Sequence, residues 1–209
     1  MLVSSQKNQL HNIALCHIAC FPKSMSSRLG IRYVKKTLEW FLVNPNRFLF
    51  HVENEHQIQG YCGGFVPQKI GDGSSSGMLQ YAFNEALVGL MTHPWLFFHA
   101  EIRHYYRFLW LNVKRKLTGK VIPISKPDPM QAEPSHVGLV VIGVHPDYRG
   151  SGAAKLLADE FEKRAKTYNR KELVLSVKSD NLRAVNAYKK FGWQVAKQDK
   201  KHLLMNKFI

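Results

Sequence analysis

The 209-residue sequence has little cysteine, little acidic charge and no long apolar run. Its three cysteines, Cys16, Cys20 and Cys62, are an odd number without the spacing of a zinc site or a disulfide framework. No stretch of about 18 apolar residues occurs, so no segment is predicted to span a membrane. The N-terminus lacks the basic-then-apolar pattern of a signal peptide. These absences favour a cytoplasmic protein of one domain without a metal. Cys16 and Cys20 are four residues apart on one face of an expected helix and are predicted to be buried core thiols, with a metal or redox role alongside His17 as the alternative.

The scarcity of acidic residues leaves a large positive charge. The 30 Lys and Arg residues outnumber the 15 Asp and Glu residues, and the formal net charge is +15. Such a charge favours anionic partners, which include phosphate-bearing small molecules, anionic membrane surfaces and nucleic acids. Nucleic acid is the least favoured of these, because no nucleic-acid-binding motif accompanies the charge.

Two common phosphate-binding patterns are also absent. No P-loop pattern occurs, and the dinucleotide pattern G-x-G-x-x-G fails because Lys155 stands at the third glycine position. The sequence instead has an apolar run at residues 139–144, a basic glycine-rich turn and then a helix-periodic segment. The amides of the turn and the positive end of the helix dipole predict an anion-binding site. Its residues are Arg149, which can neutralise a phosphate, Gly150, Ser151, Gly152, Ala153 and Ala154.

Two motifs carry a resemblance to a known family. The pattern Arg149-x-x-Gly152-x-Ala154 resembles the acyl-CoA motif of the GNAT superfamily of N-acetyltransferases. The later pattern Asn181-x-x-Ala184-x-x-x-Tyr188-x-x-Phe191-Gly192-Trp193 resembles the helix of that superfamily and the glycine–aromatic pair that ends it. The resemblance implies an α/β (α+β) fold with a mixed, mostly antiparallel sheet flanked by helices. It also implies acetyl-CoA as cosubstrate and acetyl transfer to a small-molecule primary amine.

Hydrophobic periodicity and turn signals place the remaining elements in the same order. Expected strands cover residues 2–4, 47–53, 57–66, 136–145, 173–177, 193–197 and 202–208. Expected helices cover residues 6–20, a segment from Ser26 or Ser27 to residue 41, residues 152–168 and residues 181–191, while residues 71–77 are predicted to be a loop. The domain is expected to comprise an N-terminal half at residues 1–66, a helical insertion at 67–135 and an acetyl-CoA-binding half at 136–209.

The insertion is far longer than an ordinary connection between strands. It has a helical pattern at about 78–91 and another from Pro94 to about Leu117, whose basic face has Arg103, Arg107 and Lys114. Three interpretations are open: a helical pair packed on the domain, a wall of the acceptor site, or a basic helix that contacts an anionic membrane. Its aromatic residues could also support a homodimer.

The acceptor is not fixed by the motifs. The run Phe21-Pro-Lys-Ser-Met-Ser-Ser-Arg-Leu-Gly30 is similar to the start of some bacterial family members that have a basic helical insertion and resemble sugar-modifying enzymes. This similarity favours an amino sugar or a sugar nucleotide. A peptide α-amine and a polyamine are alternatives, although the basic chain disfavours a polyamine. An alternative from a different functional class is a protein without catalytic activity, which would be an acyl-CoA-binding or membrane-surface module.

The resemblance also implies roles for residues around the turn. Tyr188 would be the general acid that protonates the leaving thiolate, and Asn181 would cap its helix and contact CoA. Gly143 predicts a β-bulge that separates its strand from the next. The backbone of Ile142 and Val144 would then bind the pantetheine arm, and the Val144 amide would stabilise the oxyanion.

The general base is not identified by the sequence. Many relatives have a glutamate in the central strand, where this chain has Gly138. His136 on the same strand and Glu133 just before it are candidates, and Glu53 on an earlier strand is a third. An ordered water chain, or an amine of low pKa, would make a protein base unnecessary.

Overall fold

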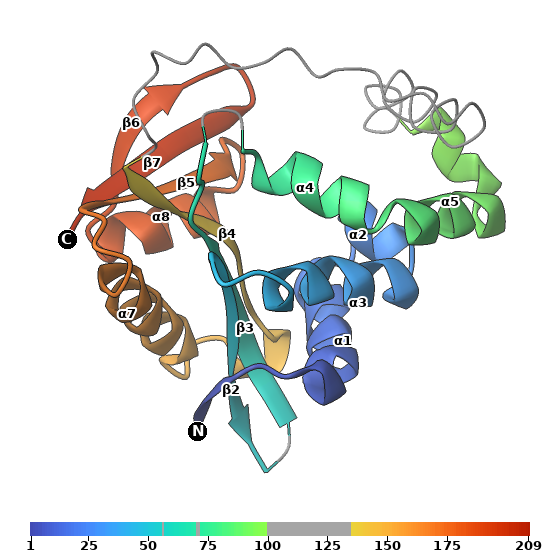
Figure 1. Ribbon diagram of the computed structural model, residues 1–209, viewed down its shortest axis with the longest axis horizontal. Coiled ribbons are helices and arrows are strands. Elements are labelled where there is room, and N and C mark those ends of the chain that lie inside the picture. The colour runs from blue at the N-terminus through green and yellow to red at the C-terminus, as the bar shows by residue number, and fades with distance from the viewer. Residues whose placement is uncertain (56, 70–71, 100–134) are drawn as a thin grey trace.

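The computed structural model describes residues 1–55, 57–69, 72–99 and 135–209. Within these residues the chain forms a seven-stranded sheet in the order β1-β2-β3-β4-β5-β7-β6 (Figure 1). Neighbouring strands are antiparallel except for β4 and β5, which are parallel. This confirms the predicted mixed, mostly antiparallel sheet. The strands are β1 Leu2–Ser4, β2 Arg47–Asn54, β3 Gln57–Phe65, β4 His136–Val144, β5 Glu172–Lys178, β6 Gln194–Gln198 and β7 His202–Phe208.

Helices cover both faces of the sheet (Figure 1). One face has α1 Leu10–Cys20, α2 Met25–Arg28 and α3 Ile31–Glu39, with α4 Ser74–Tyr81 and α5 Phe83–Thr92 further out. The other face has α7 Ala153–Lys166 and α8 Leu182–Lys190. Each face buries an apolar core, because the helices turn their apolar stripes toward the sheet. Short 3-10 helices are η1 Lys7–Gln9, η2 Trp40–Leu42, η3 Pro94–Phe98 and η4 Pro146–Tyr148.

The elements follow the predicted order, and the differences in their bounds have local causes. The helix expected from Ser26 or Ser27 is divided into α2 and α3. Ser24 caps α2, because its hydroxyl accepts a hydrogen bond from the Ser27 amide at 3.2 Å. Gly30, with a φ of +95°, then separates α2 from α3. The prediction of a loop at residues 71–77 was wrong for its last four residues, because α4 begins at Ser74.

The described part of the predicted insertion ends at residue 99. The pattern at 78–91 falls on α4 and α5. The second helix was predicted to run without a break from Pro94 to about Leu117, and this was wrong: η3 begins at Pro94 but ends at Phe98, because the backbone of His99 is extended. α5 packs against α2 and α3, where Ala86 and Leu90 share a buried cluster with Leu29 and Tyr33. The remainder of the second predicted helix, with its basic face, lies outside the described residues. Among the helices that are described, none is long and apolar enough to cross a bilayer.

Candidate active site

The central feature of the site is the point where β4 and β5 separate. The pairing of β4 with β5 runs only from His136–Glu172 to Leu139–Leu175. β5 nevertheless stays paired with β7 along its whole length. The two parallel strands therefore diverge beyond Leu139, as predicted for this part of the sheet.

A β-bulge lies at this point, but not at the predicted residue. The register of β3 against β4 shifts between Gly63 and Gly64, which leaves Val140 as the extra residue of β4. Gly143 stays in regular register opposite Tyr61. The prediction of a bulge at Gly143 was therefore wrong by three residues.

The bulge changes which side chains share a face of the sheet. Side chains of a regular strand alternate between faces. Here the consecutive residues Val140 and Val141 both pack with the core under α1 and α3. Leu139 and Ile142 pack with the core under α7 and α8. Two adjacent valines are thus presented to the α1 side of β4.

Gly143 has a packing role instead. A Cβ atom at this position would lie 3.0 Å from the Phe21 ring and 3.1 Å from both the Cys20 sulfur and the Tyr61 ring. These separations are shorter than comfortable van der Waals contacts. The glycine therefore lets the C-terminal end of α1 and Tyr61 pack directly against β4.

The backbone of Ile142 and Val144 faces the gap between β4 and β5. The His145 amide donates to the Gln59 carbonyl of β3 at 2.8 Å. Because hydrogen-bonded positions alternate along an antiparallel pair, Gly143 also bonds to β3. The amides and carbonyls of Ile142 and Val144 then point to the opposite edge, where β5 has diverged. An amide in that position can polarise a carbonyl that is placed in the gap.

A cleft of about 290 Å³ opens at this gap. β4, the basic turn, the start of α7 and the helix α8 all contribute to its lining. The structure thus brings part of the predicted site together in one lining, while Gly150, Ser151, Gly152 and Ala153 of the turn do not line the cleft. The predicted residues in the lining are Ile142, Val144, Arg149, Ala154, Asn181 and Tyr188.

The turn at the mouth of the cleft has the geometry of an anion cradle. Gly150 and Gly152 have φ values of +91° and +87°, and a Cβ atom on either would meet nothing within 4 Å. Gly152 is the N-cap of α7 and offers no side chain to the first amides of the helix, so the Ala154 amide is not capped by it, whereas the Ala153 amide donates to the Ser151 hydroxyl at 3.4 Å. The Ser151 hydroxyl donates to the Tyr148 carbonyl at 2.7 Å, which holds the turn in place. Together with Arg149, these groups fit the phosphates of CoA.

Tyr188 and Asn181 lie on the α8 side of the cleft. Burial raises the pKa of the Tyr188 phenol, which therefore stays protonated at neutral pH and can donate a proton. Its ring packs beside Trp193 with 6.0 Å between centroids. The Asn181 side chain accepts a hydrogen bond from the Ala184 amide at 3.3 Å, which confirms the predicted N-cap.

The described base candidates are not brought to the cleft. His136 begins β4, and at about 3.3 Å per residue it lies about 20 Å along the strand from Ile142. Glu53 is on β2, separated from β4 by β3, and bonds to the buried His51 at 3.3 Å. Glu133 lies outside the described residues.

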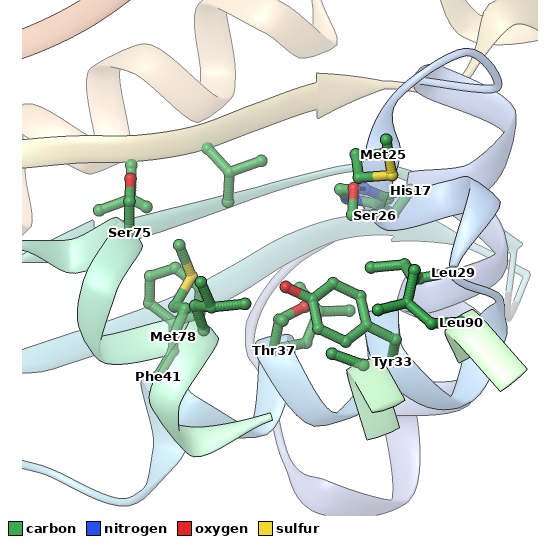
Figure 2. Close-up of a pocket in the computed structure, with 15 residues that line it drawn as sticks. His17, Met25, Ser26, Leu29, Tyr33, Thr37, Phe41, Ser75, Met78 and Leu90 are labelled. Atoms are coloured by element: carbon green, nitrogen blue, oxygen red, sulfur yellow. Dashed lines mark hydrogen bonds between the residues drawn. The ribbon is translucent and has the colours of Figure 1, made fainter. Parts of the chain in front are cut away.

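A second cavity, of about 320 Å³, lies on the α1 side of β4 (Figure 2). α1, α2, α3, α4 and α5 surround it, and the bulged valines Val140 and Val141 close it. In the described part of the chain, its lining has no Lys, Arg, Asp or Glu. Figure 2 shows His17 and Ser26 together at one end and Ser75 at the other. Sequence reasoning missed this cavity, because helices that are distant in sequence form it.

His17 is the titratable imidazole in the lining of this cavity. Its Nδ1 lies 2.5 Å from the Tyr61 hydroxyl, and its Nε2 lies 2.8 Å from the Ser26 hydroxyl. Burial lowers the pKa of the imidazole from 6.5 to about 4. His17 is therefore uncharged at neutral pH.

The last turn of α1 joins the two cavities. His17 lines the apolar cavity, while Cys20 and Phe21 line the cleft. The rings of His17 and Phe21 are in contact, with 5.1 Å between centroids. Cys16 is buried as predicted and Cys62 is buried as well, but Cys20 is only half-buried, so the prediction of a buried core thiol was wrong for Cys20. The sequence offers no signal for this difference, because both helix cysteines fit the same apolar stripe.

Comparisons with known proteins identify the family and the fold of the chain. The family model described as the acetyltransferase (GNAT) family matches residues 13–193. No curated protein sequence matches the chain significantly.

Several solved structures share the fold at low sequence identity. The PaiA N-acetyltransferase of Thermoplasma acidophilum, in complex with coenzyme A, has a TM-score of 0.57 and 11% identity, and the match covers 100% of this chain and 98% of that one. The ribosomal-protein-alanine N-acetyltransferase of Brucella melitensis has a TM-score of 0.58 and 12% identity, with 100% and 99% covered. A GNAT-family acetyltransferase of Streptococcus pneumoniae has a TM-score of 0.57 and 13% identity, with 100% and 98% covered. With the family model spanning most of its length, this chain belongs to the acetyltransferase (GNAT) family of acyl-CoA-dependent N-acetyltransferases.

Proposed function

We propose that the protein transfers the acetyl group of acetyl-CoA directly to a primary amine whose apolar carrier enters the cavity on the α1 side of β4. One observation carries this proposal. The cleft and the apolar cavity lie against consecutive residues of the same strand, Ile142 to Val144 for the cleft and Val140 with Val141 for the cavity. Two substrates bound in these places would meet at the bulged part of β4.

Each step uses a group of this chain. Bound acetyl-CoA supplies the acetyl thioester. The turn from Arg149 to Ala154 holds the phosphates, and the edge of β4 aligns the pantetheine arm. The Val144 amide donates to the thioester carbonyl and stabilises the negative charge that develops on its oxygen as the amine attacks. Tyr188 gives its phenolic proton to the departing sulfur.

The deprotonation of the amine sets the acceptor class. The pKa of His17, near 4, is about six units below that of an alkylammonium, so a proton transfer between them would cost about 8 kcal/mol. The neutral lining of the cavity disfavours the ammonium form as well. The amine must therefore react in its neutral form. A peptide α-amine, with a pKa of about 8, is neutral far more often at physiological pH than an alkylamine with a pKa of about 10.

The lining of the cavity also bears on the carrier of the amine. A sugar nucleotide needs cations or helix N-termini for its phosphates, and a sugar needs many hydrogen-bond partners. The cavity instead has Met25, Leu29, Leu38, Phe41, Met78 and Leu90 on its walls. These residues support a peptide α-amine with an apolar first side chain over the amino sugar expected from the sequence. The name of the Brucella structure gives a ribosomal-protein alanine as its acceptor. At 12% identity that name does not carry over to this chain, so the proposed acceptor rests on the lining of the cavity.

A panel of acceptors tests the proposal. CoA release is measured with acetyl-CoA and three amines: a peptide with an apolar N-terminal residue, an amino sugar and a sugar nucleotide that has a free amine. The peptide should have the highest kcat/KM. Faster turnover of either sugar would overturn the proposed acceptor, and no turnover of any amine would favour the non-catalytic alternative.

A matched pair of variants locates the acceptor. Ser75 is exposed and lines the cavity, whereas its neighbour Ser76 is exposed and does not. Ser75→Trp should raise the KM of the amine about tenfold or more by filling the cavity, because a tryptophan buries about 250 Å². The KM of acetyl-CoA should not change, and Ser76→Trp should alter neither value. Equal effects of the two variants would place the acceptor elsewhere.

A further inference from the structure

We propose that Cys20 is an acyl-accepting nucleophile of the cleft, so that the protein forms a thioester between the acetyl group and its own Cys20 sulfur. This inference rests on the proposed binding of acetyl-CoA in the cleft. The inference adds a covalent acetyl–enzyme thioester to the proposed function. Direct transfer of the acetyl group to an amine proceeds without such an intermediate.

The position of Cys20 is the first part of the argument. The residue ends α1, is half-buried and lines the cleft together with Ile142 and Val144. Its sulfur lies 3.1 Å from the point where a Cβ atom on Gly143 would stand. The sulfur therefore packs directly against Gly143 of β4, next to Val144, whose amide would hold the thioester carbonyl. The sulfur approaches from the α1 side of β4, which is also the side of the acceptor cavity.

The surroundings of Cys20 favour its thiolate. Cys16 lies one helical turn earlier, with 3.9 Å between the two sulfur atoms, within reach of a hydrogen bond in which either thiol can be the donor. This bond lowers the pKa of Cys20, and the Arg149 cation acts in the same direction, while burial opposes both. The same bond, with burial, raises the pKa of Cys16, which keeps that residue as the protonated donor.

The third cysteine provides an internal contrast. Cys62 is fully buried in the core between the sheet and α7, and burial raises its pKa well above the ordinary value. A buried, protonated thiol is neither accessible nor nucleophilic. Acylation inside the cleft is thus specific to Cys20, although the chain has three free cysteines in its described residues.

The reaction balances without an additional reagent. The Cys20 thiolate attacks the carbonyl carbon of the thioester, and a new carbon–sulfur bond forms. The bond between that carbon and the CoA sulfur breaks, and CoA leaves as a thiolate that takes the proton of the Tyr188 phenol or of solvent. One thioester is exchanged for another, so no oxidant or reductant takes part.

Mass spectrometry tests this inference directly. The purified protein is incubated with acetyl-CoA in the absence of any amine, and its intact mass and proteolytic peptides are recorded. We expect one acetyl group on the peptide that contains Cys20, none on that of Cys62, and removal of the adduct by neutral hydroxylamine. Acetylation of Cys20 should be about a hundredfold or more faster than that of a free thiol at the same concentration, because the cleft holds the two groups together.

Two variants and one binding measurement separate the outcomes. Cys20→Ala should lose the adduct and keep its calorimetric affinity for acetyl-CoA, while Cys16→Ala should form the adduct several-fold more slowly. Wild-type protein that binds acetyl-CoA and acetylates amines, yet forms no adduct on Cys20, would overturn this inference and leave the proposed function intact. Absence of any acetyl-CoA binding would overturn both.

Discussion

At the scale of single residues, Tyr188 is the group whose replacement separates chemistry from binding. Tyr188→Phe removes the phenolic proton but keeps the ring that packs beside Trp193. We expect kcat to fall about a hundredfold or more and the KM of acetyl-CoA to stay unchanged. Tyr168→Phe is the matched control, because that hydroxyl bonds to the Pro45 carbonyl at 3.0 Å, away from the cleft. Equal kcat values for Tyr188→Phe and the wild type would refute the role of general acid.

His17 makes a prediction about stability and pH. Its pKa is 6.5 when unfolded and about 4 when folded, so between these values the unfolded chain binds a proton that the folded chain does not. The free energy of unfolding should therefore decrease as the pH falls from about 6.5 to about 4, by roughly 3 kcal/mol in total. Urea denaturation of the wild type and of His17→Gln measures the effect, since the variant lacks this titration. Identical pH dependence of the two proteins would contradict the assigned burial of His17.

The residues of the motifs were predictable from the sequence, and those on α1 were not. Arg149, Gly152 and Asn181 occur in patterns whose spacing itself encodes a turn or a helix start. Cys20 and His17 acquire their positions only when α1 packs across the bulge of β4. The spacing of residues within α1 does not indicate this contact. In the sequence alone, Cys20 and His17 therefore look like ordinary core residues of an amphipathic helix.

At the scale of elements, the contact of α5 with α2 decides the shape of the acceptor cavity. A Cβ atom on Gly89 of α5 would lie 2.5 Å from the backbone carbonyl oxygen of Leu29. Gly89→Ala should therefore push α5 away, at a cost of about 1–3 kcal/mol that exceeds the helix propensity gained, about 1 kcal/mol. We expect a lower melting temperature and a higher KM for the amine, with an unchanged KM for acetyl-CoA.

Val88→Ala serves as the control for this element. Val88 is on the same helix and is exposed, so its truncation should leave both KM values and the melting temperature close to those of the wild type. If Gly89→Ala behaved in the same way, the close approach of the two helices would not exist.

The bulge shows why one element was misplaced in the sequence analysis. A glycine within a strand often marks a bulge, and Gly143 lies within the predicted strand. The register shift is set instead by how β4 pairs with β3, which presents Gly63 and Gly64 opposite it. Pairing between strands depends on residues that are distant in sequence. The pattern along β4 alone could therefore predict that β4 separates from β5, but not which residue of β4 forms the bulge.

At the scale of the whole molecule, the excess of basic residues should assist the binding of the anionic cosubstrate. With a net charge of +15, the chain attracts the phosphates of CoA over distances that salt shortens. The KM of acetyl-CoA should rise as the ionic strength increases from about 0.01 M to about 1 M, since the screening length falls from about 30 Å to about 3 Å. The KM of the amine should change little, because the described lining of its cavity has no formal charge. Steady-state kinetics at several salt concentrations measures both values, and a KM of acetyl-CoA that does not depend on salt would contradict the prediction.

The overall architecture was predictable because each element has a strong local signal. Strand and helix periods, turn glycines and the order of the motifs all indicate one topology. The insertion is different, since its expected contacts with a membrane or a second copy involve residues 100–134, outside the described part. The contacts of the insertion with a membrane and with a second copy therefore stay predictions. The role of residues 100–134 as a wall of the acceptor site also stays a prediction.

Calorimetric titration with acetyl-CoA tests the central assignment most directly. Gly152→Glu adds a side chain and a negative charge to the phosphate cradle, and Gln198→Glu adds the same charge at an exposed position of β6. Circular dichroism verifies that both variants fold. We predict micromolar binding by the wild type and by Gln198→Glu, and loss of binding in Gly152→Glu. Equal affinities of all three proteins, or no binding by the folded wild type, would contradict the location of the acyl-CoA site.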